Sequence, residues 1–157
     1  YPEYAADGQQ PDIKKILATT SIASKIGRDL SPEKTIIIGE SLGSGVAAYH
    51  AQHESYDRLI LITPFDSVLN VAQRQFPIFP VRWILTENFD TLAWVKNVSN
   101  VRILAAENDE VVPNSHAKNL FDGLTTEDKK MVMIHGVGHN TIFNSPKFAE
   151  ELVNALP

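Results

Sequence analysis

The pentapeptide Gly-Glu-Ser-Leu-Gly at positions 39–43 has the residue types and spacing that best suit chemistry in this sequence. It follows a short β-branched run, residues 35–38, which Gly39 is expected to end, and it precedes a run of small residues. A serine on a strand-to-helix turn projects its hydroxyl from the carboxyl edge of a sheet, and flanking glycines relieve crowding there. The pattern therefore predicts Ser41 as a nucleophile, with the backbone N–H of Leu42 directed at the oxyanion that forms on attack.

A serine nucleophile needs a general base, and the chain offers five histidines. His139 is the best placed, because the flexible loop at residues 136–138 can bring its imidazole back over the sheet edge. His135, at the end of the preceding apolar run, is the second candidate. The remaining three, expected to be structural or exposed, are His50, His53 and His116.

The base in turn needs a carboxylate that orients it, placed after a strand at the same edge and between the serine and the histidine in chain order. Asp109 follows the apolar run 101–106, and Pro113 behind it can start a helix and fix the loop. Asp66, after the run 59–63, is the alternative acid, although a role in turning the chain suits it better. Nearby glutamates such as Glu110 are expected to tune or solvate these loops.

Apolar runs alternate with segments of helical period along the chain, which predicts an α/β domain with a parallel sheet flanked by helices. The expected strands are residues 35–38, 59–63, 101–106 and 131–134, and the expected helices are 11–27, 42–53, 115–124 and 146–155. Right-handed crossovers should connect the strands. Residues 1–10 have no hydrophobic period and are interpreted as a loop.

Residues 65–100 interrupt this alternation, because they carry too many prolines and aromatic residues for a single crossover helix. We interpret the segment as an irregular, cap-like excursion over the strand ends. Its position between strands that carry catalytic loops suggests that Phe79 and Trp83 line a substrate pocket, the alternative being that its tryptophans belong only to the core.

The bulk composition fits one domain of a globular protein, with 157 residues of which 43% are hydrophobic and 21% charged. A net charge of -5 without a basic stripe argues against a nucleic-acid partner and favours a small molecule. The absence of cysteine excludes disulfides and a thiolate nucleophile. No signal peptide opens the chain and no apolar run reaches the roughly 20 residues of a membrane span, so a cytoplasmic location is expected. A first residue other than Met suggests that a segment lies upstream.

Three motifs in this order resemble the serine-dependent α/β-hydrolase superfamily, in particular its branch of small-cap esterase-like and serine-aminopeptidase-like proteins. They are the elbow at 39–45, the D-x-x-V-P segment within 107–113 and G-V-G-H-N at 136–140. Two further matches to that branch are Tyr1, Pro2 and Tyr4, which look like its Y-P-G-Y loop after the fourth strand, and Phe79-Pro-Val-Arg with Asn88-Phe-Asp, which look like its reduced cap. The residues of that loop that depart from the pattern are Glu3, Ala5 and Asp7.

The resemblance implies that residues 1–157 are the carboxyl-terminal part of a single hydrolase domain that lacks its first four strands and the loop with the second oxyanion donor. It implies hydrolysis of an ester or related acyl bond by Ser41, His139 and Asp109, with no metal or organic cofactor. The expected partner is a small acyl substrate, and the exposed sheet edge or the missing upstream half could mediate association. Two alternatives remain: a peptidase of the same fold, and a non-catalytic hydrolase-like binding or scaffolding protein.

Overall fold

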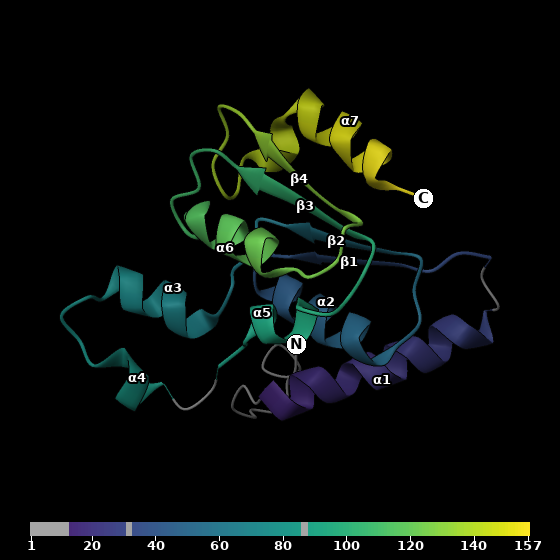
Figure 1. The fold of residues 1–157 in the computed structure, drawn as a ribbon, viewed down its shortest axis with the longest axis horizontal. Helices are drawn as coiled ribbons and strands as arrows, with labels where there is room; N and C mark the ends of the chain where they lie inside the picture. The colour runs from purple at the N-terminus through teal and green to yellow at the C-terminus, as the bar shows by residue number, and fades with distance from the viewer. Residues whose placement is uncertain (1–12, 31–32, 86–87) are drawn as a thin grey trace, which may run out of the picture.

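A four-stranded parallel sheet forms the centre of the molecule in the computed structural model, which describes residues 13–30, 33–85 and 88–157 (Figure 1). The strands are β1 (Ile36–Glu40), β2 (Arg58–Ile62), β3 (Val101–Ala106) and β4 (Lys129–Ile134), and they lie in the order β1-β2-β3-β4. All neighbouring pairs are parallel, with Ile38 opposite Ile60 and Ile103 opposite Met131. The carboxyl ends of all four strands therefore meet at one edge.

Eight short or medium helices surround the described sheet. They are α1 (Ile13–Asp29), α2 (Leu42–His53), α3 (Val68–Gln75), α4 (Val81–Ile84), α5 (Thr91–Val95), α6 (Ser115–Gly123), the 3₁₀ helix η2 (Ile142–Asn144) and α7 (Pro146–Ala155). Several begin where the sequence supplies a cap: the Ser67 side chain accepts from Asn70 N at the start of α3, and Asp90 accepts from Ala93 N at the start of α5. Pro146 occupies the first turn of α7, where its missing N–H costs nothing.

The two central strands, β2 and β3, are buried on both faces, whereas Ile38 of the edge strand β1 is 51% exposed. On one face Leu59, Leu61 and Ile103 pack with residues of α2, α5 and α6. On the other face Ile60 and Leu104 pack with residues of η2 and α7. Figure 1 shows this layering, with α7 on one side of the sheet and α2, α5 and α6 on the other. Alternate residues of each strand thus supply two separate apolar layers.

The small residues of α2 explain how this helix approaches the sheet so closely. Ala47, Ala48 and Ala51 are all buried against the strands. At Gly39 an added Cβ would overlap the carbonyl oxygen of Gly43 and lie 2.5 Å from the Cβ of Ala47. Glycine is therefore required where β1 and α2 nearly touch.

The fold class predicted from the sequence is confirmed, and the four strands lie where the apolar runs indicated. The expectation that Gly39 ends the first strand is wrong. Gly39 pairs with Leu61 and Glu40 with Ile62, because the parallel ladder continues up to the turn itself. Residues 1–10 and the start of the first expected helix lie outside the described residues.

The excursion between β2 and β3 contains three short helices, α3, α4 and α5, rather than one crossover helix. Its last helix returns to the core, where Val95 is fully buried. Its middle part, residues 76–85, is called the arm below; it carries α4 and extends away from the sheet (Figure 1). Within 13–30, 33–85 and 88–157, no helix is both long and apolar enough to cross a membrane.

Candidate active site

Ser41 occupies the turn between β1 and α2, as the sequence predicted. It has a φ of 49°, a left-handed conformation that is uncommon for residues other than glycine. Two backbone hydrogen bonds hold the turn, from Ser41 N to Ile62 O at 3.0 Å and from Ser44 N to Ser41 O at 2.9 Å. Strained backbone of this kind persists only where the surrounding structure fixes it, here through the strand on one side and the helix on the other.

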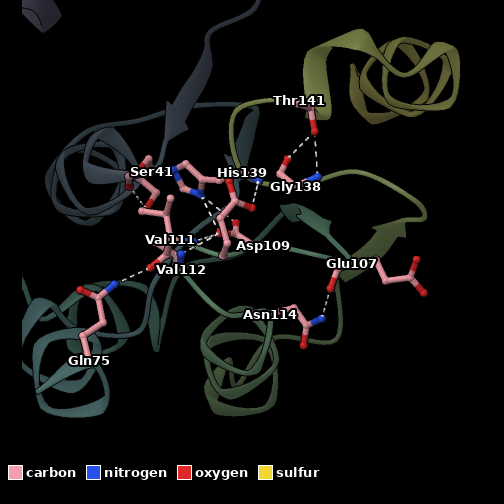
Figure 2. Close-up of polar contacts among 12 residues, drawn as sticks. Ser41, Gln75, Glu107, Asp109, Val111, Val112, Asn114, Gly138, His139 and Thr141 are labelled. Atoms are coloured by element: carbon pink, nitrogen blue, oxygen red, sulfur yellow. Dashed lines mark hydrogen bonds and ion pairs between the residues drawn. The ribbon is translucent and has the colours of Figure 1, made fainter. Parts of the chain in front are cut away.

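The three residues predicted as nucleophile, base and acid meet at the carboxyl edge of the sheet (Figure 2). His139 Nε2 lies 2.9 Å from Ser41 Oγ. The other ring nitrogen, Nδ1, lies 2.8 Å from Asp109 Oδ2 and 3.0 Å from Oδ1. Asp109 and His139 are 8% and 5% exposed, so the imidazole and carboxylate interact largely away from water. Residues far apart in the chain thus form one continuous hydrogen-bonded series.

The loop after β3, residues 107–114, fixes the carboxylate of Asp109 and is called the acid loop below. Asp109 Oδ1 accepts hydrogen bonds from Val111 N at 3.0 Å and from Val112 N at 2.6 Å. Asn114 Nδ2 donates to Glu107 O at 2.8 Å, which joins the two ends of the loop (Figure 2). Because these donors and the imidazole satisfy it, the buried carboxylate keeps one orientation.

The loop after β4 carries His139 and is fastened to the acid loop. Asn108 N donates to Val137 O at 2.9 Å, and Gly138 N donates to Thr141 Oγ1 at 2.8 Å. His139 N donates to Glu110 Oε2 at 3.2 Å. Hydrogen bonds from the backbone N–H groups of Glu110 itself and of His139 hold the pKa of the Glu110 carboxyl below its usual value. Sequence reasoning missed this link, because nothing local shows which distant loop a glutamate reaches.

The other histidines lie elsewhere. His135, the second candidate base, has a side chain that is 77% exposed and pairs with Glu107 at 3.0 Å. His53 Nδ1 contacts Tyr49 O within its own helix, and His50 contacts Ser24 of α1. His116 is buried and pairs with Asp66, the alternative acid. Of the two aspartates considered, Asp109 is therefore the one that contacts His139.

The remaining predicted site residues occupy two different places. Leu42 is the first residue of α2, where the N–H groups of a helix lack intrahelical acceptors. Phe79 and Trp83 lie on the arm and are 62% and 89% exposed. Their role in a substrate pocket stays a prediction. Among the residues that the structure describes, no cluster of three or more His, Cys, Asp or Glu side chains could hold a metal ion.

Comparison with solved structures shows which fold this is. An alpha-beta serine hydrolase homologue from Coxiella burnetii superposes with a TM-score of 0.68 at 17% identity, over 98% of this chain and 65% of its own. The sheet and its helices are thus those of the α/β-hydrolase fold, with part of the fold covered.

Sequence relatives agree, although no protein-family model matches the chain. An uncharacterised protein of Mycobacterium tuberculosis is 31% identical over 113 residues, which are 71% of this chain and 40% of that protein. The human alpha/beta hydrolase domain-containing protein 17B is 27% identical over 161 residues, covering 97% of this chain and 52% of its own length. The chain is thus similar in sequence to a protein named an alpha/beta hydrolase, and it spans about half or less of the length of these two relatives.

Proposed function

We propose that this chain carries the catalytic residues of a serine hydrolase that cleaves a carboxylic ester or a related acyl bond. The observation that supports this most strongly is the series Ser41–His139–Asp109, joined at 2.9 and 2.8 Å. A serine in a strand-to-helix turn, a histidine hydrogen-bonded to it and a carboxylate hydrogen-bonded to the histidine are the parts that acyl transfer needs.

In the proposed reaction each of the three residues has its own step. Asp109 accepts the Nδ1–H of His139, which leaves Nε2 free to accept the proton of the Ser41 hydroxyl. Ser41 Oγ attacks the carbonyl carbon of the substrate as Nε2 takes that proton, and the buried Asp109 carboxylate stabilises the imidazolium. The imidazolium then gives its proton to the leaving alkoxide, and an acyl-serine remains. Water, deprotonated by Nε2, attacks the acyl carbon. The bond from that carbon to Ser41 Oγ breaks as Nε2 returns the proton to Oγ, and the carboxylic acid is released.

The tetrahedral intermediate carries a negative charge on the former carbonyl oxygen. The N-terminus of α2 faces the turn at Ser41, so the N–H of Leu42 is the donor that this chain supplies to the oxyanion. Because the donor belongs to the same rigid turn as the nucleophile, it needs no rearrangement when the charge develops.

Three exposed apolar side chains indicate the chemical class of the acyl group. Leu42, Val111 and Phe143 are 42%, 39% and 50% exposed. They lie respectively next to Ser41, on the acid loop and on η2 just beyond His139. Exposed apolar side chains on the three segments that carry the triad suit an aliphatic or aromatic acyl chain. We propose that a longer acyl chain also contacts the exposed aromatic side chains of the arm, Phe79 and Trp83.

A panel of nitrophenyl esters and aminoacyl nitroanilides tests the proposal and separates esterase from peptidase activity. Wild-type protein should hydrolyse esters, and Ser41→Ala should lose hydrolysis by several orders of magnitude while keeping its circular dichroism spectrum. Ester turnover that a folded Ser41→Ala protein retains in full would rule the proposal out. Hydrolysis of the nitroanilides alone would assign a peptidase instead.

A further inference from the structure

A second buried aspartate–histidine pair lies at the same edge of the sheet. Asp66, on the loop after β2, and His116, in the first turn of α6, are 2% and 4% exposed. His116 Nδ1 lies 2.8 Å from Asp66 Oδ1, which also accepts from Ser67 N at 2.7 Å. The other carboxylate oxygen accepts from Asn70 Nδ2 at 3.0 Å and from Asn119 Nδ2 at 3.2 Å. The carboxylate thus has four hydrogen-bond partners.

This carboxylate is ionised at neutral pH although it is buried. Burial, the largest single influence, raises the pKa of Asp66, but the hydrogen bonds from His116, Asn70, Asn119 and Ser67 together outweigh it and lower the pKa to about 2. A buried charge is very costly when its partners leave. The partners of Asp66 are therefore held in place, and so are the elements that carry them.

Those elements are α3, which is the first helix of the excursion, and the start of α6. Asn70 belongs to α3, whereas His116 and Asn119 are three residues apart on one face of α6. Two further hydrogen bonds leave the end of α3 in the same direction. Arg74 Nη1 donates to Ser115 Oγ at 2.6 Å, and Gln75 Nε2 donates to Val111 O at 2.9 Å. Helix α3 is thus tied both to α6 and to the acid loop.

The acid loop transmits these restraints to the triad. Figure 2 shows Gln75 on Val111, and the backbone N–H groups of Val111 and Val112 on Asp109. Only Pro113 and Asn114 separate these donors from the first turn of α6. A shift of that turn moves the donors, and with them the carboxylate that holds His139. Displacements of about 1 Å in a catalytic group can cost around 100-fold in rate.

We propose that Asp66 and His116 form a positioning pair for Asp109, an inference that rests on the proposed function. Their described hydrogen bonds reach neither Ser41 nor His139, so the pair acts through the first turn of α6 and the acid loop. Helix α6 is also held by Ala117 and Leu120 in the core. Loss of the pair should therefore loosen the first turn of α6 without undocking the helix.

The proton between His139 and Asp109 gives a direct test, because an imidazole N–H bonded to a carboxylate resonates far downfield in a ¹H NMR spectrum. Its resonance is the one lost in His139→Ala. In His116→Ala it should move upfield or broaden, and kcat for a nitrophenyl ester should fall by about threefold to tenfold with KM unchanged. His116→Asn, whose amide can still donate to Asp66, should restore most of both. Val95→Ala, a buried change in α5, is the control for lost stability alone.

An unchanged His139 resonance in His116→Ala, with a melting temperature lowered as in Val95→Ala, would mean that the pair is only structural and would overturn the proposal. Should His116→Ala fail to fold, Asp66→Asn decides instead, because it keeps the side-chain volume. The resonance does not depend on turnover. Failure of the proposed function, seen as unchanged hydrolysis by Ser41→Ala, is therefore distinguishable from failure of this inference.

Discussion

Replacing Asp109 with asparagine should put the ring proton of His139 on the wrong nitrogen. Asp109 Oδ1 accepts from the backbone N–H groups of Val111 and Val112, so the amide oxygen of the new side chain must take that position. The NH₂ group then replaces Oδ2, which lies 2.8 Å from His139 Nδ1. Two donors cannot face each other, and Nδ1 becomes the acceptor. The proton moves to Nε2, which faces Ser41 Oγ at 2.9 Å and can no longer accept from it.

The expected loss is large because the fold leaves the amide no other orientation. A base in the wrong tautomer costs about 10⁴-fold in kcat, or about 5 kcal/mol of transition-state stabilisation. The assay is steady-state hydrolysis of a nitrophenyl ester near neutral pH, with circular dichroism to confirm folding. Asp66→Asn is the matched control, since it makes the same atomic change at a buried aspartate that binds a different histidine. It should keep at least about a tenth of kcat.

Retention by Asp109→Asn of more than a tenth of wild-type kcat would refute this reasoning. A greater loss in Asp66→Asn than in Asp109→Asn would show that the acid follows β2.

Three further predictions concern the elbow, acid stability and the arm. Gly39→Ala should lower the free energy of unfolding by about 3 kcal/mol in urea titrations, because its Cβ overlaps Gly43 O; an unchanged value would contradict the close contact. Because the folded pKa of Asp66 is lowered to about 2, its contribution to stability is present above its unfolded pKa of about 4 and disappears as the pH falls towards 2. Wild-type protein should therefore lose its stability advantage over Asp66→Asn across that window, and parallel curves in acid urea titrations would count against the pair. Phe79→Ala and Trp83→Ala should shift ester preference towards shorter acyl chains without lowering the melting temperature, as both residues are exposed. If preference is unchanged, these two residues do not line the acyl pocket.

Local patterns explain why much of the fold could be predicted from the sequence. The strands are short apolar runs, and such runs can be recognised without any knowledge of their neighbours in space. The turn at Ser41 is equally local, since Gly39, Ser41 and Gly43 fall within five residues. The end of the first strand was predicted wrongly because glycine usually weakens a strand. In the structure, pairing with β2 keeps Gly39 within the strand.

Long-range polar contacts explain what could not be predicted. Asp66 was expected mainly to turn the chain, and it does accept from Ser67 N. Its bond to His116, fifty residues later in the chain, depends on how α6 docks on the sheet. No local pattern links either residue to the acid loop, because the type of a hydrogen-bonding side chain does not indicate which distant residue it contacts. The preference for Asp109 over Asp66 came from chain order and resemblance, and the contact with His139 agrees with it.

Covalent labelling tests whether Ser41 is an activated nucleophile. The protein is treated with a fluorophosphonate probe, digested, and analysed by mass spectrometry of its peptides. We expect the label on Ser41, and we expect His139→Ala to slow labelling by at least about 100-fold because the proton acceptor is gone. Labelling confined to another serine, or equally fast labelling in His139→Ala, would contradict this assignment.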